Sequence, residues 1–513
     1  MQDTKQPLLN FRPAFSVAII FMLSILLPPI YLLSNVIFYV IGLVVVVALT
    51  VVLCLIRYKT HKKVAIAVMI ISLLFITFSN VAILARINYN KNANFVGEAY
   101  ITGYVTDVTK KESTKGGYEY KIVVEGEIDG NTEKIYATVF SKEDIHVYKN
   151  VKMLAKVKRF ELVYDGKINY FPLTDNIRYI STDTTLYDVG DIKQGVIPAI
   201  RYKILDTLKT YTPNSYEISY ALLTGETSLI EYGELSSYRN VGIAHIFAVS
   251  GLHIGFLYTA ISLILKLFKV KNKYAIFIIT PILFLYVAIC GFTASCLRAF
   301  SIITIHMLTT KLGYKYDALT AISLSVIMVL LISPLSMFSI GFQLSYLAYG
   351  GIVLFNKQFT ELLSKFLPNK FAKFISPFII AVLATTPVSV DAFGYLSPLT
   401  IIFNIIIVPI IGVIYVITLI TCLLLMISPV FKILAVLPEG IFVTLSNIAT
   451  TINSSAFIIR NLSFSIAKTF YYSAFIITLD KFNITYKERL ILFITLISLF
   501  ILTFIGLNVS LIS

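Results

Sequence analysis

Apolar runs of about 20 residues recur along this sequence, and they constrain its fold more than any other feature. A helix needs about 20 apolar residues to cross about 30 Å of hydrocarbon. The runs at 15–33, 36–56 and 64–85 reach that length. Hydrophobic residues make up 57% of the 513-residue chain and charged residues 14%, against about 25% charged residues in soluble proteins. The sequence therefore predicts a polytopic α-helical membrane protein.

Basic residues in short loops set the predicted orientation of these spans. Lys and Arg concentrate in the loops on the cytoplasmic side of a membrane. The loops at 57–63 and 266–273 are strongly basic, whereas the segment 91–203 holds 17 basic and 16 acidic residues. The net charge of +15 therefore lies mainly in membrane loops. Placing the basic clusters inside predicts about 13 crossings, a retained first span, a cytoplasmic N-terminus and an extracytoplasmic C-terminus.

The segment 92–195 is an extended polar region in which apolar and polar residues alternate. Runs such as YEYKIVVEGEI (118–128) and VKMLAKVKRFEL (151–162) have a period of two residues, and turns that contain glycine separate them. This pattern predicts about five or six short antiparallel strands. We therefore expect a small, extracytoplasmic β-barrel of the OB type inserted into the helical protein, with a sheet sandwich as the alternative.

Aromatic and basic residues are interleaved in this β domain, an arrangement that can stack bases and contact phosphates. The candidate DNA-contacting residues are Tyr104, Lys110, Lys111, Lys156, Lys158 and Arg159. Ordinary strand aromatics beside a solvated charged face would give the same pattern. The nearly neutral charge of the domain favours that alternative.

The remaining sequence divides around this domain. We expect N-terminal transmembrane helices (1–88), the β domain (92–195), amphipathic interfacial helices (198–240) and a transmembrane channel bundle (241–513). An ordinary helical linker fits 198–240 equally well. Four cysteines lie in apolar runs and no CxxC spacing occurs, so we expect buried free thiols, no metal site and no cofactor.

Polar residues interrupt the apolar stretch NVGIAHIFAVSGLHIGFLY (240–258). On a continuous helix, His245, Ser250 and His253 would share one broad sector. Polar side chains in a span are costly and usually face a protein interior or a water-filled cavity. Stacking within the bundle is the alternative to a pathway lining. A serine hydrolase is less compatible, because AVSGL lacks the GxSxG pattern and no acid lies nearby to orient a histidine.

Three further segments carry polar residues between apolar runs. Arg298 follows the turn GFTAS, where it could hold a phosphate in an outer vestibule or snorkel to the membrane surface. Gln343 and Ser345 lie among glycines that also suit close helix packing. Asn404 lies in a stretch broken by prolines, a pattern tolerated at membrane depth beside a cavity. The predicted lining of a water-accessible path is His245, Ser250, Gly251, His253, Gly255, Arg298, Gln343, Ser345 and Asn404.

These segments together resemble the ComEC competence family, which are polytopic inner-membrane proteins that carry single-stranded DNA into bacteria during transformation. The matching motifs, in the order of the family, are the LTGE element (223–226), HIFAVSGLHIG (245–255), GFTASCLRA (291–299), SIGFQLSYLAYGGI (339–352) and PLTIIFNIIIVPI (398–410). The resemblance covers about 215–510. The β domain is similar in position and size to the N-terminal OB-like domain of the family.

The resemblance implies a multi-pass protein of the bacterial plasma membrane that transports single-stranded DNA. Many family members continue into a metallo-β-lactamase-like domain, a proposed nuclease. This sequence contains no HxHxDH motif and ends shortly after its last apolar run, so we expect no enzyme activity of that type here. A permease for a small polar solute and an intramembrane hydrolase that uses Ser250 and His253 remain alternative functions.

The resemblance also implies partners. Besides single-stranded DNA and the lipid bilayer, we expect a DNA receptor on the outer face. Degradation of the other strand would need a separate nuclease or does not occur, and a monomer and a homo-oligomer both stay open. The sequence contains no GxxxxGK[ST] motif for nucleotide binding, so energy would have to come from a cytoplasmic ATPase or helicase, or from an ion gradient.

Overall fold

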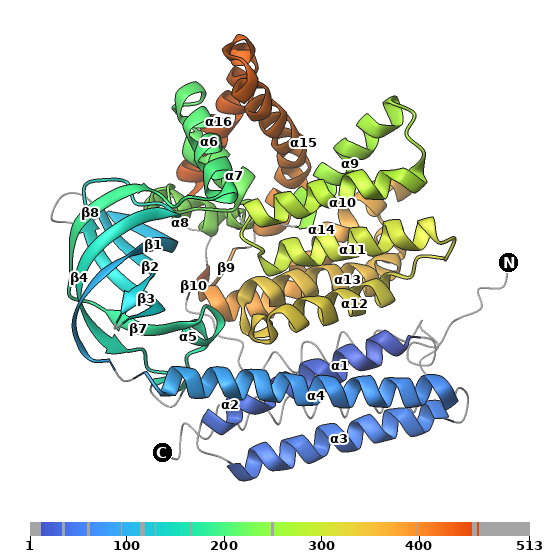
Figure 1. Ribbon diagram of the computed structural model, residues 1–513. Coiled ribbons are helices and arrows are strands. Elements are labelled where there is room, and N and C mark those ends of the chain that lie inside the picture. The colour runs from blue at the N-terminus through green and yellow to red at the C-terminus, as the bar shows by residue number, and fades with distance from the viewer. Residues whose placement is uncertain are drawn as a thin grey trace.

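Layers of helices and one β domain make up the protein (Figure 1). A computed structural model describes residues 12–32, 36–58, 62–93, 95–112, 118–128, 130–164, 167–247, 251–397, 399–453 and 459–460. The two last predicted spans, 468–478 and 490–512, lie outside the described residues. The long helices run side by side, and the β domain lies against one end of them.

The N-terminal layer consists of α1 (Pro13–Ile25), α2 (Leu27–Leu32), α3 (Val36–Tyr58) and α4 (Lys62–Lys91). The first predicted span is interrupted at Leu26, just before Pro28 and Pro29, because proline lacks an N–H donor and disrupts the preceding helical turn. α1 packs between α4 and the bundle, whereas most of the apolar face of α3 is exposed.

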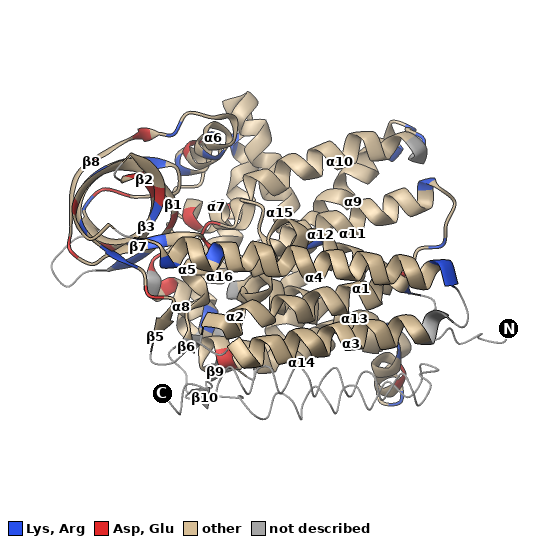
Figure 2. Ribbon diagram, turned by 60° about the horizontal axis from the view of Figure 1, so that its bottom comes forward, with Lys and Arg blue, Asp and Glu red and all other residues tan. Residues whose placement is uncertain are grey.

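The β domain follows α4. Its strands are β1 (Gly97–Glu112), β2 (Tyr118–Ile128), β3 (Asn131–Ser141), β4 (Lys149–Arg159), β5 (Val163–Tyr164), β6 (Lys167–Ile168), β7 (Ile177–Ser181) and β8 (Thr184–Ile192), with the short helix α5 (Tyr170–Thr174) before β7. The main sheet has the order β1-β2-β3-β7-β4-β8, and β4 also pairs with β1. The five strands β1, β2, β3, β7 and β4 therefore form a closed ladder, which Figure 2 shows as a ring.

The alternation in the sequence explains this sheet. Every second residue along the middle of β3 is buried, and residues such as Ile101 and Val124 fill the interior of the ring. Gly103 pairs with Gly126 of β2 and Val151 of β4, so β1 contributes to two ladders there. A Cβ at Gly103 would lie 2.3 Å from the Glu125 carbonyl oxygen, so only glycine allows this close approach.

Three helices connect the β domain to the bundle: α6 (Val196–Tyr211), α7 (Tyr216–Thr224) and α8 (Tyr232–Val241). They pack on α15 and α16 and share one hydrophobic core with the bundle. Ile204 and Leu208 on α6 and Leu222 on α7 are buried in that core, which explains the amphipathic pattern of this segment.

The bundle then comprises η1 (Ala244–Ile246), α9 (Gly251–Leu267), α10 (Asn272–Ile289), α11 (Ala294–Lys311), α12 (Ala318–Ile332), η2 (Pro334–Phe338), α13 (Ile340–Leu363), α14 (Asn369–Phe393), α15 (Leu399–Ile427), η3 (Pro429–Ala435) and α16 (Val436–Asn453). The short strand β9 (Tyr395–Leu396) pairs with β10 (Ile459–Arg460). Side-chain caps define two of the helix starts: Asp317 accepts from the Thr320 amide at 2.9 Å, and Ser339 from the Phe342 amide at 3.3 Å.

Six helical segments within the described residues are long and apolar enough to cross a membrane: Pro13–Leu32, Val36–Leu55, Lys62–Lys91, Asn369–Phe393, Thr400–Ile427 and Pro429–Thr451. Three shorter apolar helices are Gly251–Leu267, Tyr274–Ile289 and Ala318–Ile332. The prediction of a mostly helical membrane protein with a separate β domain is confirmed. The number of crossings stays a prediction, because helix length and composition alone do not fix it.

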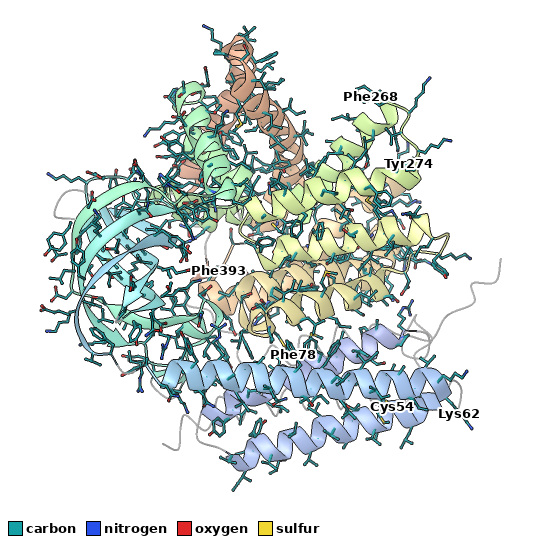
Figure 3. All side chains as sticks on the ribbon, viewed as in Figure 1. Cys54, Lys62, Phe78, Phe268, Tyr274 and Phe393 are labelled. Carbon is teal, nitrogen blue, oxygen red and sulfur yellow. The ribbon has the colours of Figure 1, made fainter. Side chains whose placement is uncertain are left out.

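The two ends of the bundle differ. Phe393, at the end of α14, lies beside the β domain, whereas Lys62, Phe268 and Tyr274 lie at the opposite end (Figure 3). The basic loop 266–273 is therefore on the side of the bundle away from the β domain.

Candidate functional site

The first polar motif lies where α8 leads into α9. His245 belongs to η1, and α9 begins at Gly251, so the continuous helix assumed for this motif is wrong. Because His245 lies in η1 and His253 lies in α9, the two histidines do not share one helical face. His245 is exposed, and its Nδ1 lies 3.1 Å from the carbonyl oxygen of Gly242. Ser250 lies outside the described residues.

Arg298 is buried where α9, α11 and α13 meet, and it is only 9% exposed. It lies in the first turns of α11, near the end of the bundle that faces the β domain. Its Nε donates to Ser345 Oγ at 2.7 Å, and its guanidinium lies 5.2 Å from the centre of the Tyr349 ring and 5.9 Å from that of Tyr346. A Cβ placed on Gly251 would be 2.4 Å from Arg298 Nη2, so the guanidinium reaches the start of α9.

No carboxylate among the described residues forms an ion pair with Arg298. Burial of an uncompensated cation is unfavourable, and such a group is usually paired or functional. The terminal nitrogens of Arg298 also make no hydrogen bond within the described part of the chain. The arrangement can therefore accept an anion.

A chain of hydroxyl groups lies behind this arginine. Ser301 Oγ donates to the Arg298 carbonyl at 2.8 Å and lies 2.6 Å from Ser325 Oγ, which in turn lies 2.9 Å from the Tyr346 hydroxyl. These contacts connect α11, α12 and α13. They hold Tyr346 in place beside the guanidinium without adding negative charge.

Two other predicted lining residues are packed in the core. His253 is 4% exposed, and its ring lies edge-on to Tyr415, with 4.8 Å between the ring centres. Asn404 is 8% exposed, and its Oδ1 has no hydrogen-bond partner within the described residues. His253 therefore lies where α9 packs on α15, and Asn404 is buried on α15.

The remaining predicted residues differ in their surroundings. Gln343 Nε2 donates to the Met337 carbonyl at 3.2 Å, which closes the turn from η2 into α13. Gly255 has open space around the position of a Cβ. Ser345 contacts Arg298 directly, so the structure brings together Gly251, Arg298 and Ser345 from three separate motifs.

A second polar cluster joins the β domain to the helices. Glu226 is 8% exposed, and it accepts hydrogen bonds from Arg201 Nη2 at 2.5 Å, Ser228 Oγ at 2.6 Å, the Val147 amide at 3.0 Å and the Tyr220 hydroxyl at 3.3 Å. Val147 lies in the loop between β3 and β4. Glu226 therefore attaches that loop to α6 and α7 through one buried carboxylate.

Comparison with known proteins identifies the family. The sequence model of the Competence protein family matches residues 222–483. The chain belongs to the Competence protein family. It is also 28% identical over 232 residues to "ComE operon protein 3" of Bacillus subtilis (strain 168), which corresponds to 44% of this chain and 29% of that protein. The matched part is thus less than a third of the relative. No solved structure matches.

Membership in the Competence protein family, together with the apolar helices of the described residues, agrees with the prediction of a multi-pass membrane protein. The matched range begins within α7 and includes Glu226, Gly251, Arg298 and Ser345. The cluster around Arg298 therefore lies entirely within the matched range. The cluster around Glu226 lies partly within it.

Sequence reasoning missed several members of these clusters. Tyr346 and Tyr349 contact Arg298, and their spacing of three residues on α13 places them on one helical face. That spacing was a usable signal. Arg201 carried no such signal, because its partner Glu226 is 25 residues away and belongs to a different element.

The candidate residues of the β domain lie in different surroundings. Lys110 Nζ lies 3.1 Å from Asp144 Oδ1 and 3.8 Å from the centre of the Tyr118 ring. The ring of Tyr104 lies beneath Lys193 Nζ at 3.4 Å, and burial together with a hydrogen bond to Glu125 raises the pKa of Tyr104 to about 12.

By contrast, the side chains of Lys111, Lys156, Lys158 and Arg159 are exposed. Arg159 Nη1 donates to the Lys91 carbonyl at 3.2 Å, at the end of α4. The exposed basic residues are thus the ones of this group available to a large ligand.

The described residues contain no cluster of metal ligands, because no group of three His, Cys, Asp or Glu side chains among them could hold a metal ion.

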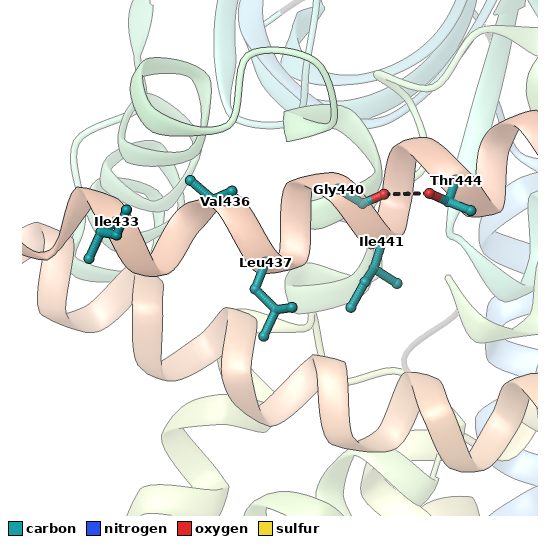
Figure 4. A pocket seen from close by; sticks show the side chains of 6 residues that line it. All are labelled: Ile433, Val436, Leu437, Gly440, Ile441 and Thr444. Atoms are coloured by element: carbon teal, nitrogen blue, oxygen red, sulfur yellow. Dashed lines mark hydrogen bonds between the residues drawn. The ribbon is translucent and has the colours of Figure 1, made fainter.

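A hollow of about 520 Å³ lies along η3 and α16, lined by Ile433, Val436, Leu437, Gly440, Ile441 and Thr444 (Figure 4). The Thr444 hydroxyl donates to the Gly440 carbonyl at 2.7 Å, so the hollow presents mainly apolar groups.

Proposed function

We propose that this protein transports single-stranded DNA across the bacterial plasma membrane during natural transformation. The observation that carries this proposal is Arg298, a buried cation without a carboxylate partner among the described residues, located near the end of the bundle that faces the β domain. A DNA strand carries one phosphate charge per nucleotide, so a path for it needs cations that are not neutralised by the protein.

The topology that goes with this function has about 13 crossings, a cytoplasmic N-terminus, and an extracytoplasmic β domain and C-terminus. Its support is the basic loop 266–273 at the end of the bundle opposite the β domain. We propose the same division as the sequence predicts: membrane helices in 1–88, the β domain in 92–195, interfacial helices in 198–240 and the channel bundle in 241–513.

The β domain is proposed to be an OB-like barrel that receives the strand outside the membrane. The closed ladder of five strands supports this assignment. Lys111, Lys156, Lys158 and Arg159 are the basic residues with exposed side chains, and they would contact the DNA backbone. Tyr104 and Lys110 would support that surface through their contacts within the domain.

Within the bundle, we propose a path that passes His245, Gly251, Arg298 and Ser345. His245 is exposed, and Arg298 lacks a carboxylate partner in the described chain. These two residues are the main support for the proposed path. His253, Gly255, Gln343 and Asn404 would shape the wall through packing, and Ser250 is also a proposed lining residue.

Partners complete the proposal. A receptor on the outer face would deliver DNA, a cytoplasmic ATPase or helicase would pull the strand, and a separate nuclease would degrade the second strand. The protein itself would act without enzymatic activity, as a channel of one or more copies.

The test is deletion of the gene in a transformable host, followed by measurement of fluorescent DNA that becomes protected from external nuclease. We expect protected DNA to disappear while DNA bound at the cell surface remains, and a plasmid copy should restore uptake. Unchanged protection after deletion would refute the function.

A further inference from the structure

We propose that Tyr100 and Tyr187 form a platform on the outer face of the β domain, on which the bases of single-stranded DNA stack. Lys156 and Lys158 of β4 contact the backbone phosphates of the same strand. This inference rests on the proposed function and names the residues that hold the bases outside the membrane.

The two tyrosines come from the strands on either side of β4. Tyr100 of β1 lies opposite Leu154 of β4, and Tyr187 belongs to β8, which pairs with the other edge of β4. Strands that flank a common neighbour are about 10 Å apart. The ring centres are nevertheless only 5.9 Å apart, with 35° between the ring planes. Both rings therefore lean toward each other over β4.

An irregularity in β8 brings the second ring into this position. Lys152 pairs with Asp188 and Met153 pairs with Leu186, so Tyr187 is an extra residue between two paired positions. Such a β-bulge bends its strand and redirects a side chain, and bulges are common beside binding and active sites. The tyrosine pair thus depends on a local departure from regular pairing.

Both rings are accessible to a large ligand. Tyr100 and Tyr187 are each 59% exposed, whereas Tyr120, in the aromatic pair that it forms with Tyr118, is completely buried. β4 and β8 lie on the side of the β domain that faces away from the helices (Figures 1 and 2). The pair therefore presents aromatic surface to the outside rather than to a core.

Lysines follow the tyrosine pair along the same face of β4. Lys152, Lys156 and Lys158 are exposed, and the alternate residues of the strand point into the barrel and are buried. Lys156 comes two residues after Leu154, so it is next to the position of Tyr100 on this face.

The ion pairs of these lysines indicate where a phosphate backbone would lie. Lys152 Nζ is 3.2 Å from Asp188 Oδ2, so its charge is already compensated. Lys156 and Lys158 form no ion pair within the described residues, although Glu98 lies opposite Lys156 in the β1–β4 ladder. The uncompensated cations are therefore on one side of the tyrosine pair.

This combination of rings and cations selects single-stranded nucleic acid among phosphate-containing ligands. Every base has a flat face that can stack on an aromatic ring, and cations beside the rings bind the backbone. In a duplex the base faces are already stacked within the helix. Free phosphate and lipid headgroups have no base to place on the tyrosines.

The test uses the full chain in nanodiscs of phosphatidylcholine. Fluorescence anisotropy follows the binding of a fluorescein-labelled oligothymidylate, and of an abasic oligomer of the same length, at several salt concentrations. Tyr100→Leu and Tyr187→Leu remove the rings but keep apolar side chains, and the corresponding Phe variants keep the rings. Tyr164→Leu is the matched control, because that tyrosine of β5 is 73% exposed. Thermal unfolding of each variant checks its fold.

We expect each leucine variant to bind the oligothymidylate at least about fivefold more weakly, because a stacking partner of the base is lost. Binding of the abasic oligomer and the salt dependence should stay as in the wild type. The Phe variants and Tyr164→Leu should bind like the wild type.

A lysine variant tests the phosphate contact separately. Lys156→Gln should flatten the slope of log affinity against log salt by about 0.7, for both oligomers, since one phosphate contact is lost. Lys121→Gln, at an exposed lysine of β2, should keep the wild-type slope.

Three results would overturn the platform. Wild-type affinity in both leucine variants would show that no base stacks on these rings. An equal loss of affinity for the abasic oligomer would show that the rings act only through the fold of the sheet. A wild-type protein that binds both oligomers equally well would show that bases contribute nothing. The proposed function is refuted by a different result, which is unchanged nuclease-protected DNA after deletion of the gene.

Discussion

Arg201 and Arg298 are two buried arginines that the protein surrounds in opposite ways. Arg201 contacts the Glu226 carboxylate at 2.5 Å and the Tyr220 hydroxyl at 3.4 Å. Arg298 contacts Ser345 and two tyrosine rings, and no described carboxylate pairs with it. The first arginine connects elements of the folded protein. The second lies inside the bundle without such an ion pair in the described chain.

The presence or absence of a carboxylate partner changes how much stability is lost when each arginine is replaced. Removing one partner of a buried ion pair leaves an uncompensated charge and typically costs about 3–5 kcal/mol. Removing a buried cation that has no carboxylate partner among the described residues leaves no opposite charge uncompensated. The same substitution should therefore lower stability at Arg201 but not at Arg298.

The largest expected effect is at the paired arginine. Arg201→Met leaves the Glu226 carboxylate buried without its cation, so we expect the free energy of unfolding to fall by about 3–5 kcal/mol. The measurement is denaturant unfolding of the full chain in mixed micelles. The double variant Arg201→Met with Glu226→Gln removes both charges and should recover most of the loss. Wild-type stability in the single variant would show that the pair contributes nothing.

The same substitution at Arg298 should spare stability and abolish function. Arg298→Met removes a charge whose insertion at membrane depth costs about 2.5–3.5 kcal/mol, so we expect unfolding to be unchanged or shifted toward greater stability. Nuclease-protected DNA in cells should fall at least about tenfold, in line with the loss of a charged contact. A loss of stability as large as that of Arg201→Met would remove the contrast between the two sites.

The fold was predictable where local patterns decide it. The period of two residues in 118–128 and 151–162 revealed β2 and β4, and the apolar run at 36–56 revealed α3. The predicted span 64–85 covers only part of α4, because polar residues follow it. These residues continue the helix to Lys91, and Asn90 donates to the carbonyls of Pro172 and Ile177 in the β domain.

The candidate site was predictable only in part. Its motifs identified Arg298 and Ser345 as separate features, because each interrupts an apolar run. Their contact depends on the packing of α11 against α13, and the approach of Arg298 to Gly251 depends on the packing of α11 against α9. Neither local periodicity nor composition contains this information.

A smaller effect should separate the charge of Arg298 from its orientation. Ser345→Ala removes the acceptor for Nε, so the guanidinium keeps its charge but loses one fixed edge. We expect oligonucleotide affinity to fall by about 1 kcal/mol while the salt dependence stays at the wild-type slope. Ser323→Ala is the control, because the hydrogen bond of that buried serine within the described residues is to the Leu319 carbonyl in its own helix. A flatter slope in Ser345→Ala would mean that the serine affects the charge contact itself.

The smallest effect concerns a third arginine, Arg12, which forms a two-fold contact with Asp317 at 2.8 and 2.9 Å. Partial burial acts to raise the pKa of Asp317, but the hydrogen bonds from Arg12 and Thr320 outweigh it and hold the pKa at about 2. The folded pKa lies below the unfolded one, so the contribution to stability is present above about pH 4 and is lost as the pH falls toward 2. The Asp317 side chain is 40% exposed, so solvent screening limits this contribution to about 1 kcal/mol or less. Wild-type unfolding should therefore change more between pH 5 and pH 3 than unfolding of Asp317→Asn, whereas equal changes would show that the pair does not couple to pH.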